Sequence, residues 1–135
     1  MSDNNPSEIA TVLTDQAPVP AGHYVQATVY GGMVYVSGQL PVRPGGTHAP
    51  EASFQDQARQ ALDNLLAVVR AAGSSPERLL KVTAYIAGVE NWPHFNSVYA
   101  DVLGDIKPAR AVVPVPELHY GYLVEIDAVA AVDSK

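Results

Sequence analysis

Two charged residues, Arg110 and Glu125, are the first candidates for chemistry because each interrupts an apolar stretch. Arg110 opens the run 111–113, Ala-Val-Val, and Glu125 lies between Val124 and Ile126. A charge inside an apolar strand costs free energy unless it is paired, hydrogen-bonded or in contact with water. Opposite charges in neighbouring strand patterns therefore indicate a paired site or a wet cleft. Considered separately, Arg110 is better explained as an ion-pair partner and Glu125 as part of a solvated sheet face.

The composition argues against several other kinds of site. There is no cysteine, and the four histidines lack the spacing of a metal-binding motif such as HExxH, so neither thiolate chemistry nor a metal centre is indicated. The formal net charge is −6 and the basic residues are scattered, which argues against a nucleic-acid surface. A small anionic ligand is compatible with this charge because one arginine can bind a carboxylate.

Length and hydropathy favour one soluble domain over residues 1–135. The first residues, 1–7, are polar and are expected to form a flexible tail. The N-terminal stretch lacks a signal-peptide pattern, and no apolar run reaches the roughly 18 residues of a membrane span. A cytoplasmic protein that does not bind membranes is the expectation.

The elements that must position the two charges alternate between strand and helix. Helical periodicity marks 52–72 and the segment from Asn91 to Gly104, and strand patterns mark 9–14, 24–30, 33–36, 80–87, 110–115 and 122–132. Gly31-Gly32 predicts a hairpin between the second and third strands. This order predicts an α+β domain, one sheet with both helices packed on the same face.

Two details of the strands bear on the site. Leu80, Val82, Ala84 and Ile86 are predicted to share the buried face of their strand, and Pro114 requires an edge strand, a bulge or an early end because it has no N–H to donate. The other sheet face mixes polar and apolar residues. It is therefore predicted to be a subunit interface with ligand sites in the seam.

Several segments resemble the RidA (YjgF) family of reactive-intermediate deaminases, in family order over residues 18–132. They are Gly22 to Gln26 (GHYVQ), Val36 to Pro41 (VSGQLP), Gln57 to Leu65 (QARQALDNL), Ala71 to Gly73 (AAG), Asn96 to Tyr99 (NSVY), Pro108 to Arg110 (PAR) and Val124 to Ala128 (VEIDA). The resemblance implies a chorismate-mutase-like fold with one mixed sheet, and a homotrimer in which three sheets form a central barrel. It also implies a ligand pocket at each subunit interface.

The family activity is hydrolysis of 2-imino acids to 2-oxo acids and ammonia, without a metal or organic cofactor. By resemblance, Arg110 holds the substrate carboxylate and Glu125 orients or deprotonates water. The remaining matched pocket positions are Tyr24, Ser37, Gly38, Asn96 and Val112, the glycine and the valine through their backbone N–H groups. Helical pattern alone would leave Asn96 as an exposed surface residue.

The chain departs from the family pattern around the pocket. His23 replaces a common proline, Val112 replaces a frequent cysteine, and residues 119–122 (His-Tyr-Gly-Tyr) are unusually aromatic. The aromatic segment favours a larger or aromatic imine, as in a biosynthetic pathway. A non-catalytic module that senses a carboxylate metabolite is the other main interpretation. An endoribonuclease ranks last because the net charge opposes RNA binding.

Overall fold

The computed structural model describes residues 8–133, so the predicted tail, 1–7, lies outside the described residues. The strands and helices are β1 (Ala10–Val12), β2 (Ala27–Tyr30), β3 (Met33–Gln39), α1 (Phe54–Ala71), β4 (Leu79–Ala87), α2 (Trp92–Leu103), β5 (Ala109–Val115) and β6 (Val124–Ala131). Short 3-10 helices are η1 (Pro76–Arg78), η2 (Val89–Asn91) and η3 (His119–Gly121). The predicted order of strands and helices is confirmed.

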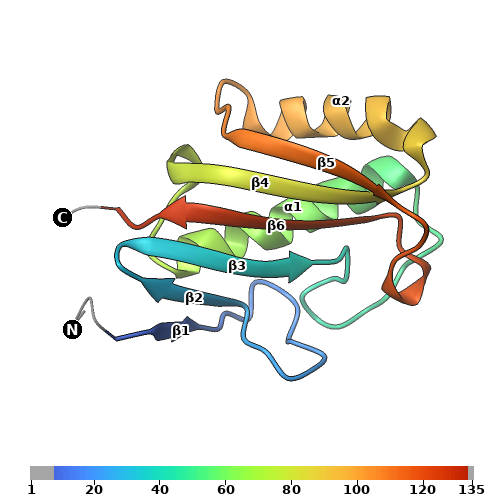
Figure 1. Ribbon diagram of the computed structural model, residues 1–135. Helices are drawn as coiled ribbons and strands as arrows, with labels where there is room; N and C mark the ends of the chain where they lie inside the picture. Colours follow the sequence, from blue (N-terminus) through green and yellow to red (C-terminus); the bar gives the residue numbers. More distant parts are fainter. Residues whose placement is uncertain (1–7, 134–135) are drawn as a thin grey trace.

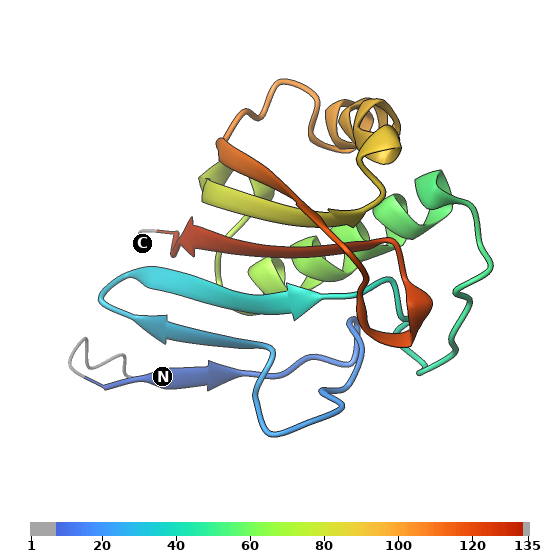
Figure 2. The ribbon, with the colours of Figure 1, turned by 45° about the vertical axis from the view of Figure 1, so that its right-hand side comes forward.

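The strands form one mixed sheet in the order β1-β2-β3-β6-β4-β5. The β4–β5 pair is parallel and the other neighbours are antiparallel. Both helices cover the same face of this sheet (Figures 1 and 2). The α+β architecture is therefore confirmed, and the hairpin forms as predicted, with φ of 58° at Gly31 and 79° at Gly32.

Helix α1 follows from local chemistry. Ser53 caps it by accepting a hydrogen bond from the Asp56 N–H, and Gly73 follows its C-terminus with φ of 86°. The apolar stripe of α1 is buried against β3 and β6, together with residues of α2. Its buried members include Phe54, Ala58, Leu62, Leu65 and Val69.

The prediction for Leu80 was wrong. Its side chain is 44% exposed, and Leu79 is buried in its place. The β4–β6 register shifts between Leu79 and Lys81, and this irregularity changes which side chain faces the helices. The prediction for Pro114 is confirmed, because β5 is an edge strand and can accommodate a residue that lacks an N–H.

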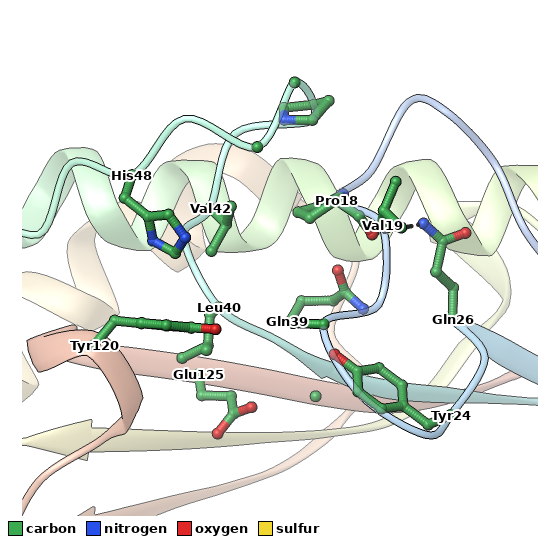
Figure 3. A pocket seen from close by; sticks show the side chains of 15 residues that line it. Pro18, Val19, Tyr24, Gln26, Gln39, Leu40, Val42, His48, Tyr120 and Glu125 are labelled. Carbon is green, nitrogen blue, oxygen red and sulfur yellow. Dashed lines mark hydrogen bonds between the residues drawn. The ribbon is translucent and has the colours of Figure 1, made fainter.

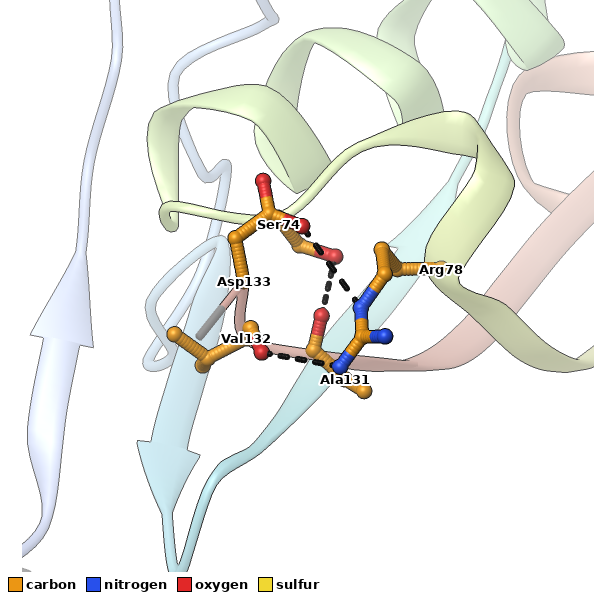
Figure 4. A network of polar contacts seen from close by, with 5 residues as sticks. All are labelled: Ser74, Arg78, Ala131, Val132 and Asp133. Carbon is orange, nitrogen blue, oxygen red and sulfur yellow. Dashed lines mark hydrogen bonds and ion pairs between the residues drawn. The ribbon is translucent and has the colours of Figure 1, made fainter. Parts of the chain in front are cut away.

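The end of β6 is fastened to the turn after α1 (Figure 4). The Ser74 hydroxyl donates to the Ala131 carbonyl, and Arg78 donates to the Val132 carbonyl at 3.2 Å. Arg78 also lies 3.5 Å from a carboxylate oxygen of Asp133. These contacts fix one end of the strand whose other end carries Glu125.

The open sheet face carries both polar and apolar side chains, as the sequence predicted. Along β6 the side chains alternate, with Val124, Ile126, Ala128 and Ala130 buried under the helices and Glu125 and Asp127 half-buried on the open face. Exposed Tyr35 lies on the same face. Whether this face is a subunit interface stays a prediction. Within residues 8–133, no helix is long and apolar enough to cross a membrane.

Candidate active site

A pocket of about 340 Å³ opens between the connector after β1, the 39–48 loop and the start of β6 (Figure 3). Three predicted site residues, Tyr24, Gly38 and Glu125, line it together. In Figure 3, Tyr24 and Glu125 both lie in the lower part of the view, with Glu125 to the left of Tyr24. The pocket has the size of a small-molecule site.

Gly38 lies directly against the carboxylate of Glu125. A Cβ atom at position 38 would be 2.6 Å from Glu125 Oε2, which is closer than non-bonded carbon and oxygen atoms approach. The absence of a side chain at Gly38 therefore defines where the carboxylate can lie. This close approach is the kind that a glycine in a strand permits.

Ser37 ties β3 to the segment that carries Tyr24. Its hydroxyl donates to the Val25 carbonyl at 2.7 Å, and its backbone N–H donates to the Gln26 carbonyl at 2.9 Å. Ser37 is not among the residues that line the pocket. In this chain it therefore positions the pocket wall.

Buried amide side chains hold the two loops of the pocket. Gln26 accepts from the Thr14 N–H at 2.6 Å and donates to the Pro18 carbonyl at 2.9 Å, which fixes the connector. Asn64 of α1 donates to the carbonyls of Leu40 and Val42 at 3.0 and 2.8 Å. The core therefore positions the loops that approach Glu125.

The surroundings of Glu125 favour its protonated form. Burial raises the pKa of this carboxyl above its usual value, and the negative charge of Asp127 raises it further, whereas His119 acts in the opposite direction. Burial also raises the pKa of Asp127, which accepts a hydrogen bond from the Tyr85 hydroxyl at 3.3 Å. A half-buried carboxyl with a raised pKa in a pocket is a candidate general base.

Arg110 occupies a different place in the fold. Its guanidinium carbon lies 5.0 Å from the ring centre of Tyr99 and 5.9 Å from that of Phe95, both on α2. Within residues 8–133 it forms no ion pair, so its N–H donors are not committed to a carboxylate. The aromatic rings hold the cation while leaving its edge free for a planar anion.

Arg110 and Glu125 do not form a paired site within one chain, and whether they share a site between subunits stays a prediction. Strand β4 separates β5 from β6. Arg110 is in register with Val82, whose side chain is buried under the helices, whereas Glu125 is in register with Tyr85 on the open face. The two charges therefore lie on opposite faces of the sheet in one chain.

The predicted residues fall into two groups. Tyr24, Gly38 and Glu125 line the pocket, and Ser37 supports its wall. Val112 lies two residues after Arg110 on β5, and Asn96 is exposed on α2, the helix that contacts Arg110. The described chain does not bring Arg110, Val112 and Asn96 to the pocket of Glu125.

Two pocket residues received no site role from the sequence. His48 lines the pocket, and its Nδ1 lies 3.0 Å from the Tyr122 hydroxyl. Tyr120 also lines the pocket. The aromatic composition of 119–122 signalled Tyr120, but no spacing could link His48 to a partner 74 residues away. Among residues 8–133, no cluster of three or more acidic or histidine side chains could hold a metal ion.

Comparisons with known proteins agree with the fold described above. A family model described as Endoribonuclease L-PSP matches residues 14–132. A RutC family protein of Pyrococcus horikoshii is 38% identical over 119 residues, covering 88% of this chain and 94% of that protein. The crystal structure of Escherichia coli TdcF with bound serine has a TM-score of 0.87 and 36% identity, covering 92% of this chain and 99% of that one. The Escherichia coli YjgF gene product has a TM-score of 0.85 and 35% identity, with 90% and 98% covered.

Proposed function

The chain belongs to the Endoribonuclease L-PSP family, which includes the RidA and YjgF proteins, and on that premise we propose that it hydrolyses 2-imino acids. The observation that carries the proposal is Glu125, a half-buried carboxyl with a raised pKa that lies against Gly38 in a pocket. Such a group can accept a proton from water and return it to a leaving amine.

The proposed reaction needs no strong nucleophile, because a protonated imine is already electrophilic. Glu125 accepts a proton from water while the water oxygen bonds to the imine carbon. Glu125 returns this proton to the nitrogen of the resulting carbinolamine. As the C–N bond breaks, the hydroxyl becomes the carbonyl of the 2-oxo acid, and the departing ammonia takes up the hydroxyl proton. The products are a 2-oxo acid and ammonium. Positioning of water and substrate supplies most of the rate effect.

Arg110 is proposed to bind the substrate carboxylate at the pocket of a second copy of the chain. In one chain Arg110 and Glu125 lie on opposite sheet faces, so a shared site requires another subunit. The open sheet face offers the surface for that contact, and a homotrimer is the proposed assembly. Binding of serine to TdcF supports a small carboxylate ligand for this scaffold.

Cleavage of RNA is disfavoured, although the family is described as Endoribonuclease L-PSP. A nucleic-acid site neutralises phosphates with clustered Lys and Arg, whereas this chain has a formal net charge of −6. The pocket residues with side-chain charge are Glu125 and, when protonated, His48. This electrostatic environment suits a small molecule better than a polyanion.

The deciding experiment generates 2-iminobutyrate and 2-iminopropionate in situ and traps surviving imine with semicarbazide. We expect the wild type to accelerate release of 2-oxo acid and ammonia. Arg110→Ala should lower kcat/KM about ten- to hundredfold by removing charge-assisted hydrogen bonds. Glu125→Gln should lower kcat about 10²- to 10⁴-fold by removing the base.

Arg59→Ala is the matched control, because Arg59 pairs with Asp101 at 2.7 Å on the exposed helical surface. It should retain wild-type rates. If the wild type binds 2-oxobutyrate through Arg110 but accelerates no imine hydrolysis, the protein is a carboxylate-sensing module and the deaminase proposal is wrong.

A further inference from the structure

Three ring side chains contact one another beside the pocket, with their planes tilted, and two of them, His48 and Tyr120, line it. The ring of Tyr120 lies 3.7 Å from that of His119 and 4.5 Å from that of His48, measured between ring centroids. His48, Tyr120 and Glu125 all line the pocket, and Tyr120 lies between the other two in the view of Figure 3. We call His48, His119 and Tyr120 the aromatic wall.

A buried anchor fixes this wall. Tyr122 is only 1% exposed, its hydroxyl lies 3.0 Å from His48 Nδ1, and it accepts from the Ala49 N–H at 3.2 Å. The 39–48 loop and the turn at η3 are thereby joined through one phenol oxygen. An aromatic surface held from both sides loses little conformational entropy when a ligand packs on it.

The backbone at Tyr120 has a conformation that is uncommon for an aromatic residue. Its φ is 63° and its ψ is 10°, the left-handed region that glycine and asparagine adopt most readily. The next residue, Gly121, also has a positive φ. A bulky aromatic side chain is therefore retained where the backbone alone favours glycine.

The remaining pocket lining is largely apolar near the loops. Pro18, Val19, Leu40 and Val42 contribute to it, together with Tyr24. This wall of mutually tilted rings, combined with an aliphatic lining, fits a planar apolar group, because aromatic rings gain from offset-stacked and edge-to-face contacts beyond their area. A short aliphatic side chain would leave the wall uncovered.

We propose that the aromatic wall selects substrates whose side chain is an aromatic ring, so that the preferred ligand is an aromatic 2-imino acid. This inference rests on the proposed function and names its substrate class. The ring of the substrate packs against Tyr120 while the imine carbon faces Glu125. The wall makes Tyr120 a specificity-determining residue.

The test compares Tyr120→Gly and Tyr120→Phe with the wild type, using the full chain. Binding of phenylpyruvate and 2-oxobutyrate is measured by calorimetry, and hydrolysis is measured with imines that an amino-acid oxidase makes from phenylalanine and 2-aminobutyrate. We expect the wild type to prefer the aromatic compound in both assays. Tyr120→Gly should reduce that preference about two- to tenfold, and Tyr120→Phe should keep it.

The glycine variant removes the ring and relieves the positive φ, so its Tm should equal or exceed that of the wild type. Loss of preference therefore cannot arise from unfolding. Equal binding of the two oxo acids by the wild type, or an unchanged preference in Tyr120→Gly, would overturn the proposal. If no imine is hydrolysed but the binding preference depends on Tyr120, the deaminase proposal fails and the wall still selects aromatic carboxylates.

Discussion

At the scale of single residues, the site depends on the absence of a Cβ atom at Gly38. Gly38 leaves room for the carboxylate of Glu125, and an added Cβ would be 2.6 Å from Oε2. The obstructed group is the end of a flexible side chain, so the fold can adapt while the carboxylate moves. Function and stability should therefore separate at this position.

We predict that Gly38→Ala lowers kcat for imine hydrolysis about a hundredfold, because displacing a catalytic group by about 1 Å has an effect of that order. The free energy of unfolding should change by less than about 1 kcal/mol. Steady-state kinetics and denaturant titration measure the two quantities.

Gly45→Ala is the control, because Gly45 lines the same pocket and a Cβ there meets no atom within 4 Å. It should leave kcat unchanged. Full activity in Gly38→Ala would show that the position of the Glu125 carboxylate does not limit the reaction.

At the scale of elements, β6 brings two carboxyls of raised pKa to one face. Burial raises the pKa of both, and the negative charge of Asp127 raises that of Glu125 further. A general base must be ionised, so activity should fall as the pH drops through the raised pKa of Glu125.

The raised pKa also makes stability depend on pH. In the unfolded chain Glu125 has its usual pKa near 4.5. The folded state binds the proton more tightly, so the stability that protonated Glu125 contributes is complete below that value and lost as pH rises through the folded pKa.

We predict that Asp127→Asn moves the acidic limb of the kcat/KM profile to lower pH, because it removes a negative charge that raises the pKa of Glu125. The same variant should raise Tm at neutral pH, and this gain should vanish in acid. Glu77→Gln removes an equal charge in η1 and should leave the limb in place. An acidic limb that Asp127→Asn does not move would remove Glu125 from the role of base.

Elements built from local chemistry were predictable. Ser53 and Gly73 mark the ends of α1, and Gly31-Gly32 requires a hairpin, because these signals act within a few residues. The register shift that exposes Leu80 depends on pairing between β4 and β6, which are distant in sequence. The link between His48 and Tyr122 depends on the tertiary fold in the same way.

At the scale of the whole molecule, sequence could identify Arg110 and Glu125 but not their relation. Both were recognisable as charges in apolar strands. The sheet face on which each charge lies, and the presence of β4 between their strands, depend on the sheet order β6-β4-β5. No local sequence pattern specifies that order. Because Arg110 and Glu125 lie on opposite faces of the sheet in one chain, a site shared between copies can be tested by mixing variants.

We predict that mixing the impaired Arg110→Ala and Glu125→Gln subunits raises activity above that of either variant. In a cyclic trimer each site takes Glu125 from one copy and Arg110 from the next, so random 1:1 exchange should make about a quarter of the sites wild-type. Each variant refolded alone is the control and should keep its reduced activity. If the mixture is no more active than the mean of the two variants after exchange is verified, both residues act within one chain and the shared site is wrong.

Pro114 on β5 has a consequence for how copies of the chain associate. An exposed edge strand is a template on which another molecule can add a strand, and unlimited addition produces fibrils. Pro114 removes one donor from that template, and the opposite edge, β1, is only three residues long. Neither border of the sheet favours growth by strand addition. The homotrimer proposed above uses the broad face of the sheet instead, where a closed ring ends after a fixed number of members.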